Sequence, residues 1–335
     1  MVTIADVAKR AGVSKMTVSR VINNSGYISQ KTRERVEQAI DELGYVPNSL
    51  ARSLRFKTTA TIALILTDIT NPFFTTVARG VEDTAREHGF SVMFCNTDES
   101  EDVEAQYLNV LIQKQVDGLL LVPACSSARA ATLLQERHVP FVLLDRYIPG
   151  MTVDNVRSDS EQGAYELVQH LVQLGHRDIA LLGGPPQITT TIDRVTGYLR
   201  ALEEAGLRDR AIVCHGGYTQ ESGYRMTKEV LAADPRPTAL FGVNNFIAIG
   251  ALRALREAQY QVPDDISVVA FDDLSSAFLI EPFLTVSNQS PYEMGKVGTS
   301  LLLARLANPE PTTPQEIMLP TQLIVRKSSG PPPAK

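Results

Sequence analysis

A group of short polar side chains and cations near the N-terminus, together with one methionine, has the residue types that contact DNA. They lie opposite the apolar side of a predicted helix and comprise Lys15, Met16, Thr17, Ser19 and Arg20. Hydroxyl groups and cations of this kind reach base edges and phosphates when a helix lies in a major groove. The segment is therefore predicted to read DNA, and the alternative is a small helical bundle that binds nothing.

A second group of polar and aromatic side chains follows the ends of predicted strands in the rest of the chain. The set comprises Asn71, Phe73, Phe74, Asp145, Arg146, Arg194, Tyr218, Asn244, Asp272 and Gln289. Aromatic rings stack on the C–H faces of sugars, and charged or amide groups hold sugar hydroxyls in paired hydrogen bonds. A single Asp or Asn at a strand end often only caps a turn. Recurrence at so many strand ends favours a sugar-binding site.

Enzyme signatures are missing from the sequence. No phosphate-binding loop, dinucleotide fingerprint or nucleophile elbow occurs. The five histidines lack metal-ligand spacing, and His176 in L-G-H-R-D is predicted to be a surface residue after a helix. Asp272 and Asp273 are adjacent on a strand end, so their side chains diverge and are not expected to form an acid–base pair. We expect no catalytic residue, no metal site and no cofactor.

Three short helices are predicted to position the N-terminal group, at 3–11, 15–22 and 30–43. Thr3 with Asp6 is expected to cap the first helix, and Ser14 the second. Gly12 is expected to end the first helix. Two helices around a short turn that contains glycine form a helix-turn-helix. Residues 1–46 are therefore predicted to be an all-α helix-turn-helix domain.

Residues 47–59 are predicted to connect this domain to the rest. Pro47 can begin a helix over N-S-L-A-R-S-L-R, but so short a helix is unstable alone in water. We interpret the segment as a hinge helix that folds only on DNA and against its twin from a second subunit. The alternative is a plain linker, which the composition by itself favours.

From Thr61 onward, short apolar runs alternate with amphipathic stretches. The runs begin at T-I-A-L-I-L and end at I-S-V-V-A-F, and helices are expected near 73–88, 102–114, 127–137, 160–174, 191–206, 219–232 and 245–258. This alternation predicts α/β architecture with two lobes built on doubly wound parallel sheets. Ligands bind beyond the carboxyl ends of such strands, so the site is expected in the cleft between the lobes. The predicted core is 60–326, with one lobe at 60–157 plus 287–315, the other at 158–286 plus 316–326, and a Pro-rich tail at 327–335.

Composition and charge agree with this division. The chain has 335 residues, 44% of them hydrophobic and 21% charged, which suits folded domains rather than disorder. Residues 1–57 hold ten basic and five acidic residues, a balance of +5, and the remainder holds 22 and 33, a balance of −11. A basic head on an acidic body suggests that the head contacts a polyanion. No apolar run is long enough to span a membrane, no signal peptide is evident, and three cysteines without C-x-x-C fit a reducing cytoplasm.

The head and hinge resemble the DNA-binding region of the lactose/galactose repressor family of bacteria. The resemblance is nearly continuous over about 55 residues, from T-I-A-D-V-A-K-R-A-G-V-S-K-M-T-V-S-R to L-G-Y-V-P-N-S-L-A-R-S-L. It implies that Lys15, Met16, Arg20 and Leu54 hold operator-reading positions, with Leu54 wedged into a central base step. The full set of candidate DNA-binding residues is Thr3, Ser14, Lys15, Met16, Thr17, Ser19, Arg20, Asn23, Tyr27, Asn48, Ala51 and Leu54.

Residues 60–326 resemble the effector-binding core that these repressors share with periplasmic sugar-binding proteins. The resemblance rests on N-P-F-F, L-D-R, R-V-T-G-Y, F-G-V-N-N and V-V-A-F-D-D. It implies that the strand-end group surrounds a sugar, as in ribose-binding proteins. Tyr218 replaces a phenylalanine there, Val122 an asparagine, and Phe246 follows Asn244-Asn245 where N-D is usual. Ile188 occupies the position of an arginine in purine repressors, so a furanose or pyranose sugar is expected rather than a purine.

The sequence therefore predicts a cytoplasmic, homodimeric transcription regulator, most simply a repressor. Its expected partners are near-palindromic double-stranded operator DNA, a small effector and a second copy of the chain, with no membrane. The C-terminal S-S-G-P-P-P-A-K lacks leucine heptads, so a tetramer helix is not expected. The alternatives are a stand-alone sugar-binding protein, which a gel-shift assay would distinguish, and a sugar hydrolase, which turnover assays would test.

Overall fold

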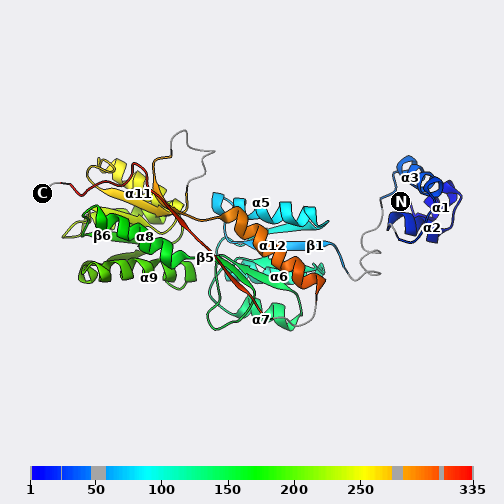
Figure 1. Cartoon of the computed structure of the whole chain (residues 1–335), viewed down its shortest axis with the longest axis horizontal. Helices are drawn as coiled ribbons and strands as arrows, with labels where there is room; N and C mark the ends of the chain where they lie inside the picture. The colour runs from blue at the N-terminus through cyan, green and yellow to red at the C-terminus, as the bar shows by residue number, and fades with distance from the viewer. Residues whose placement is uncertain (1, 24, 47–57, 274–281, 309–312, 334–335) are drawn as a thin grey trace. The chain divides into compact units, whose positions relative to one another are not determined.

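The computed structural model describes residues 2–23, 25–46, 58–273, 282–308 and 313–333. It divides into two compact units, Met1–Thr59 and Ala60–Lys335, which are described separately (Figure 1). The predicted hinge positions Asn48, Ala51 and Leu54 lie outside the described residues.

The first unit contains three helices, α1 (Ile4–Ala11), α2 (Lys15–Ile22) and α3 (Gln30–Leu43). Thr3 and Asp6 form a capping box on α1, in which the Asp6 carboxylate accepts a hydrogen bond of 2.9 Å from the Thr3 backbone N–H. Gly12 has φ of +63°, and a Cβ there would lie 2.9 Å from Nη2 of Arg35, so the turn requires glycine. Apolar side chains of all three helices form one small core, and the predicted helix-turn-helix is confirmed.

The second unit contains two six-stranded sheets. The first has the order β11-β5-β4-β3-β1-β2, and all its neighbouring strands are parallel. Its strands are β1 (Thr61–Leu66), β2 (Ser91–Asn96), β3 (Gly118–Leu121), β4 (Phe141–Leu144), β5 (Asn155–Ser158) and β11 (Glu316–Leu319). Side chains alternate between the faces, so Ile62 and Leu64 pack under one helix layer and Ala63 and Ile65 under the other.

The second sheet has the order β12-β10-β9-β8-β6-β7 and is parallel except for its edge strand β12, which pairs antiparallel with β10. Its strands are β6 (Ile179–Gly183), β7 (Ile212–His215), β8 (Ala239–Gly242), β9 (Ser267–Phe271), β10 (Thr285–Asn288) and β12 (Gln322–Ile324). The predicted pair of doubly wound sheets is confirmed, with this one antiparallel edge added.

Helices cover both faces of each sheet (Figure 1). They are α5 (Pro72–Glu87), α6 (Glu101–Gln113), α7 (Arg129–Glu136), α8 (Ser160–Gln173), α9 (Thr189–Glu204), α10 (Gln220–Leu231), α11 (Asn245–Glu257) and α12 (Pro291–Ala307), with a 3₁₀ turn at Arg208–Arg210. On the first sheet, α5 and α12 share one core and α6 and α7 share the other. A Cβ on Gly80 of α5 would lie 2.2 Å from the Tyr292 carbonyl oxygen of α12, so these helices need glycine to approach so closely.

The chain passes between the lobes three times, and two of the predicted lobe boundaries are wrong. The predicted boundary between 286 and 287 falls within strand β10, but all of this strand lies in the second sheet. The chain therefore crosses to the first lobe after Asn288. Strand β11 pairs with β5 of the first sheet, so Glu316–Leu319 belongs to the first lobe and the last crossing follows it. These short strands are placed by their ladder partners, which sequence spacing does not reveal.

His176 is buried, contrary to the prediction of a surface position. Its side chain is 1% exposed, its Nδ1 lies 2.8 Å from the Thr238 hydroxyl and its Nε2 lies 2.8 Å from the Gly330 carbonyl oxygen. Ser328 is also buried and donates to the Val268 carbonyl oxygen at 2.6 Å. The described part of the C-terminal segment is thus hydrogen-bonded to the second lobe. No helix in the described ranges is long and apolar enough to cross a lipid bilayer.

Candidate functional site

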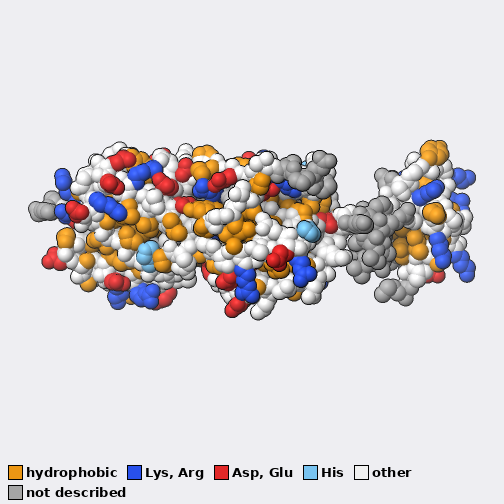
Figure 2. All heavy atoms as spheres, turned by 90° about the horizontal axis from the view of Figure 1, so that it is seen from below, with side chains coloured by type: hydrophobic (Ala, Val, Ile, Leu, Met, Phe, Trp, Pro, Cys, Tyr) orange, Lys and Arg blue, Asp and Glu red, His pale blue; other side chains and the backbone are white. Residues whose placement is uncertain are grey.

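The exposed side of α2 carries the DNA-reading candidates. Lys15, Met16 and Arg20 are exposed, and 60% of the Met16 side chain surface is accessible although methionine is apolar. Val18 and Val21 fill the buried side of the same helix. Figure 2 shows Lys and Arg side chains on the face of the head that is in view. The helix therefore presents cations and an uncommitted apolar side chain to the outside, as a helix in a major groove requires.

The polar candidates of the head are already engaged in local hydrogen bonds. Ser14 caps α2 by accepting from the Thr17 backbone N–H at 3.1 Å, and the two hydroxyls lie 2.9 Å apart. Asn23 donates to the Ser19 carbonyl oxygen at 2.7 Å, and its own Oδ1 has no partner among the described atoms. Tyr27 is 93% exposed. Thr3 and Ser14 thus have structural roles as caps, whatever further contacts they make.

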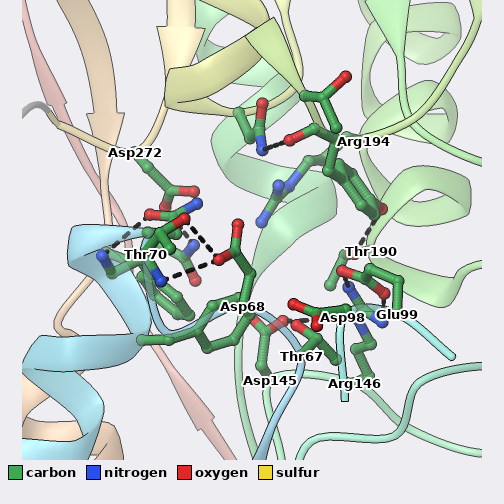
Figure 3. Close-up of a pocket in the computed structure, with 17 residues that line it drawn as sticks. Thr67, Asp68, Thr70, Asp98, Glu99, Asp145, Arg146, Thr190, Arg194 and Asp272 are labelled. Carbon is green, nitrogen blue, oxygen red and sulfur yellow. Dashed lines mark hydrogen bonds and ion pairs between the residues drawn. The ribbon is translucent and has the colours of Figure 1, made fainter. Parts of the chain in front are cut away.

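One pocket brings together all ten strand-end residues that the sequence selected. It has a volume of about 340 Å³ and lies between the two lobes of the second unit (Figure 3). Seven further residues line it: Thr67, Asp68, Thr70, Asp98, Glu99, Thr190 and Thr219. Five of the seven follow the same strands or begin the same helices as the predicted ten, whereas Asp98 and Glu99 follow β2, whose end contributes none of the ten. A wider window after every strand would include all seven. Val122 is fully buried and is not among the described lining residues.

The first lobe contributes an aromatic corner to the pocket. Asn71 caps α5 by accepting from the Phe73 backbone N–H at 3.0 Å. This cap fixes the first turn, where the Phe73 and Phe74 rings meet edge-on with centroids 5.1 Å apart and planes at 78°. Both rings are buried among apolar residues of the first lobe and also line the pocket. The corner offers apolar surface for the C–H face of a ligand.

Arg146 is buried beside Glu99 at another wall. Its Nη1 and Nη2 donate to the two Glu99 carboxylate oxygens at 2.6 and 2.7 Å, and Nη1 also donates to the Pro123 carbonyl oxygen at 2.9 Å. Burial lowers the pKa of Arg146, but the charge and hydrogen bonds of Glu99, with smaller contributions from Tyr218 and Asp145, together raise it above its ordinary value. The Nε atom has no hydrogen-bond partner among the described atoms. Figure 3 shows Arg146 and Glu99 together on one side of the pocket, away from Asp272.

Arg194 is the second buried cation. Its Nη1 donates to the Val243 carbonyl oxygen at 2.6 Å, and its guanidinium carbon lies 3.9 Å from the centre of the Phe271 ring. Burial raises the pKa of Asp145 and raises that of Asp272 to about 6, while the positive charge of Arg194 acts on both in the opposite direction. Asp272 also accepts from the Gln289 amide. The Arg194 guanidinium can donate to the hydroxyls of a ligand, and the two carboxyl groups can accept from them.

The second lobe completes the pocket with Tyr218 and Asn244. The Tyr218 hydroxyl lies 3.0 Å from the hydroxyl of Thr190, and its ring faces the Arg146 guanidinium at 5.5 Å. Asn244 caps α11 by accepting from the Ile247 backbone N–H at 2.8 Å, which aims its amide group at the pocket. Tyr218 and Asn244 are distant in sequence, and they meet because Tyr218 follows β7 and Asn244 follows β8.

Polar contacts join the two lobes around the pocket. The side-chain amides of Asn71 and Asn245 exchange two hydrogen bonds, of 3.1 and 3.0 Å, and both side chains are buried. Farther out, the Tyr147 hydroxyl donates to Asp193 at 3.1 Å, and Arg157 lies 3.6 Å from the same carboxylate. Asn71 also lines the pocket, so a ligand there contacts a residue that holds the lobes together.

The described residues contain no group of three or more His, Cys, Asp or Glu side chains placed to hold a metal ion. The pocket is instead rich in hydroxyls, amides, carboxylates and guanidiniums around an aromatic corner. Its chemistry is that of hydrogen bonding to a polyhydroxylated ligand.

Comparisons with known proteins match both units. Residues 3–48 match the family described as bacterial regulatory proteins, lacI family, and residues 59–327 match periplasmic binding proteins and sugar binding domain of LacI family. The chain is 37% identical over 329 residues to the ribose operon repressor of Halalkalibacterium halodurans, covering 98% of this chain and 97% of the relative. It is 35% identical to the transcriptional repressor PurR of Histophilus somni, covering 98% and 99%.

Solved structures give the same result. The lac repressor dimer bound to operator and the anti-inducer ONPF has a TM-score of 0.86 at 30% identity, covering 98% of this chain and 99% of that one. A LacI family transcriptional regulator from Enterococcus faecium with bound ribose has a TM-score of 0.73 at 33% identity, covering 81% and 99%.

Proposed function

Because this chain belongs to the LacI family of bacterial regulatory proteins, we propose that it is a repressor whose hold on operator DNA is controlled by a sugar. As a member of the family it is a DNA-binding transcriptional regulator with an effector-binding core. Its relatives are regulators, and we propose no enzymatic activity for it. A regulator of this kind acts on the chromosome, so we assign it to the cytoplasm.

The observation that carries the sugar assignment is the single pocket shared by the ten selected residues. Carboxylates and guanidiniums suit vicinal hydroxyls, and the Phe73 and Phe74 corner suits a C–H face. The solved relative with ribose and the relative named as a ribose repressor support the same class. Relatives named PurR make purines the alternative effector class, so both classes belong in a screen.

A thermal-shift screen of the full chain against sugars and purines tests the effector class. A ligand at about 100 times its dissociation constant stabilises the folded protein by about 2.7 kcal/mol, which is readily detected. Stabilisation by a furanose or pyranose and not by purines is the expected outcome. Stabilisation by purines alone would overturn the sugar proposal.

We propose that DNA is bound by a homodimer, with α2 of each head in a major groove and the hinge segments in the minor groove between them. The lac repressor relative was solved as a dimer on operator. Selection from random DNA should return a near-palindrome with a central C-G step, to which Leu54→Ala binds more weakly. Recovery of sites without an inverted repeat would contradict the dimeric arrangement.

The effector and the operator are proposed to be thermodynamically coupled. Lobe contacts such as Asn71–Asn245 border the pocket, so a ligand that favours one lobe arrangement shifts the populations of both. Coupling of about 1–3 kcal/mol is typical, and it must be reciprocal. Effector affinity measured with and without operator should therefore differ by the same factor as operator affinity with and without effector. Equal effector affinities would show that pocket and DNA are uncoupled.

A further inference from the structure

The charges around the pocket select among sugars. The charged residues that line it are five carboxylates and two guanidiniums, a formal balance of −3: Asp68, Asp98, Glu99, Asp145, Asp272, Arg146 and Arg194. No lysine or histidine is among the described residues that line the pocket. An anionic ligand would enter a negative potential unless a cation were free to pair with it. The two guanidiniums decide whether such a cation exists.

The Nη1–Nη2 edge of Arg146 is occupied, and its Nε, which has no hydrogen-bond partner among the described atoms, is buried where a ligand does not reach it. Arginine recognises phosphate and carboxylate groups through two parallel N–H donors, and both donors of that edge are directed at Glu99 at 2.6 and 2.7 Å. The Nη1 group also donates to the Pro123 carbonyl oxygen, which holds the guanidinium in place. Glu99 thus occupies the position that a ligand phosphate would need.

Arg194 is committed as well, although less completely. Its Nη1 donates to the Val243 carbonyl oxygen, and its guanidinium carbon lies 3.9 Å from the centre of the Phe271 ring. Its Nε has no hydrogen-bond partner among the described atoms but is buried. Its charge also acts on the buried Asp145 and Asp272 carboxyl groups. A second anion beside this cation would also lie near these two carboxyl groups and be repelled by them. Hydroxyl groups, in contrast, can donate to these carboxylates and accept from the guanidinium without adding charge.

We propose that the pocket takes an uncharged sugar and excludes sugars that bear a phosphate or carboxylate, with Glu99 setting this selectivity by occupying the paired donors of Arg146. The inference rests on the proposed function, because it takes the pocket as the effector site. It names the class of effector more narrowly than the proposed function does.

Inorganic phosphate tests the role of Glu99 without any sugar. Glu99→Gln and Glu99→Ala should bind phosphate about tenfold more tightly than the wild-type chain, since a freed guanidinium edge forms a strong charge-assisted pair. The gain should disappear in Glu99→Ala combined with Arg146→Gln. Thermal shift and calorimetry on the full chain give the affinities, and circular dichroism of each variant verifies that it folds.

Asp98→Asn is the matched control. Asp98 also lines the pocket and also has a positive φ, so the exchange removes one negative charge at the same wall and leaves the Glu99–Arg146 pair intact. Asparagine accepts this backbone conformation. Phosphate affinity should rise less than in the Glu99 variants, because the negative potential falls while the paired donors of Arg146 stay occupied. An equal gain in Asp98→Asn and in the Glu99 variants would show a general charge effect and would overturn the role of Glu99.

Matched sugar pairs test the ligand class itself. The probes are D-ribose with D-ribose 5-phosphate and D-glucose with D-glucose 6-phosphate, each measured on the wild-type chain and on the Glu99 variants. The wild-type chain should bind the uncharged sugar of each pair more tightly than the phosphorylated one. In the Glu99 variants the ratio of these two affinities should be about tenfold smaller. A wild-type preference for a phosphorylated member would overturn the proposal.

The sugar effector and the exclusion of anions by Glu99 can be contradicted independently. If the Glu99 variants gain phosphate binding but neither they nor the wild-type chain binds a sugar, the proposal of a sugar effector is contradicted. The proposal that Glu99 excludes anions from the pocket is then retained. Sugar binding by the wild-type chain without a phosphate gain in either Glu99 variant would retain the proposed function and overturn this inference.

Discussion

The head and the pocket hold their functional side chains in contrasting ways. The described candidates of the head lie between Thr3 and Tyr27, and those that carry charge, Lys15 and Arg20, are exposed. The candidates of the pocket are spread from Asn71 to Gln289, and its charged groups Arg146 and Arg194 are each less than 5% exposed. The head presents its chemistry on one helix, whereas the pocket assembles its chemistry from both lobes.

This contrast indicates which substitutions change function without changing stability. A surface side chain can be replaced at little cost to folding, because water solvates it before and after. A buried charge is held by partners, so its removal leaves those partners uncompensated. Changes at the head surface should therefore affect DNA alone, and changes in the pocket should affect stability and ligand together.

The largest expected effect is in the pocket. Arg194→Met should lower the free energy of unfolding of the core by about 3–5 kcal/mol, because Asp145 and Asp272 are left as buried carboxyl groups without their cation. Urea unfolding followed by circular dichroism measures the loss. Arg20→Met in the head is the matched control and should change stability by less than about 0.5 kcal/mol. Similar losses in the two variants would refute the contrast.

A pH profile sharpens the comparison within the core. Glu104 is 3% exposed, accepts from the Ala124 backbone N–H at 2.7 Å, and burial raises its pKa to about 7 from 4.5. The folded state then binds a proton more tightly than the unfolded state, so stability rises as the pH falls through this window. Between pH 7 and pH 5 the gain should be about 2 kcal/mol. Glu104→Gln should flatten the profile, and parallel profiles would show that Glu104 does not titrate there.

The head core gives the next effect. Val18 is fully buried in the small core of the head, and Val18→Ala should cost that unit about 2 kcal/mol. Operator binding should weaken because the head unfolds more often, while effector binding by the core should be unchanged. Gel shift and calorimetry on one preparation measure both. A fall in effector affinity without DNA present would show that the two units are energetically joined.

The smallest effect is at the head surface. Arg20→Ala should weaken operator binding by about 1–2 kcal/mol if the guanidinium contacts a base or phosphate, and should leave the melting of the head unaltered. Competition gel shifts against specific and random DNA measure the change. Lys31→Ala, an exposed cation at the start of α3, is the control for charge alone. An equal loss from Lys31→Ala would deny Arg20 a specific role.

Prediction from sequence succeeded where the signal is local. The predicted caps at Thr3 and Ser14 lie next to the helices they begin, and each accepts a backbone hydrogen bond from the first turn of its helix. The helix α12 is absent from the predicted pattern because its apolar residues surround it and leave no single stripe. His176 was misplaced because its partners, Thr238 and Gly330, are distant in sequence.

The sequence by itself determined the helix-turn-helix, the alternation of strands and helices and the ten strand-end residues that line the pocket. Hydrogen bonds along the chain and the periodicity of apolar residues encode these features within a few positions. Only the tertiary structure decided that Glu99 pairs with Arg146, that Asn71 meets Asn245 and that β11 joins the first sheet. Those contacts join residues 47, 174 and more than 150 positions apart, and packing of whole lobes, rather than any local pattern, brings them together.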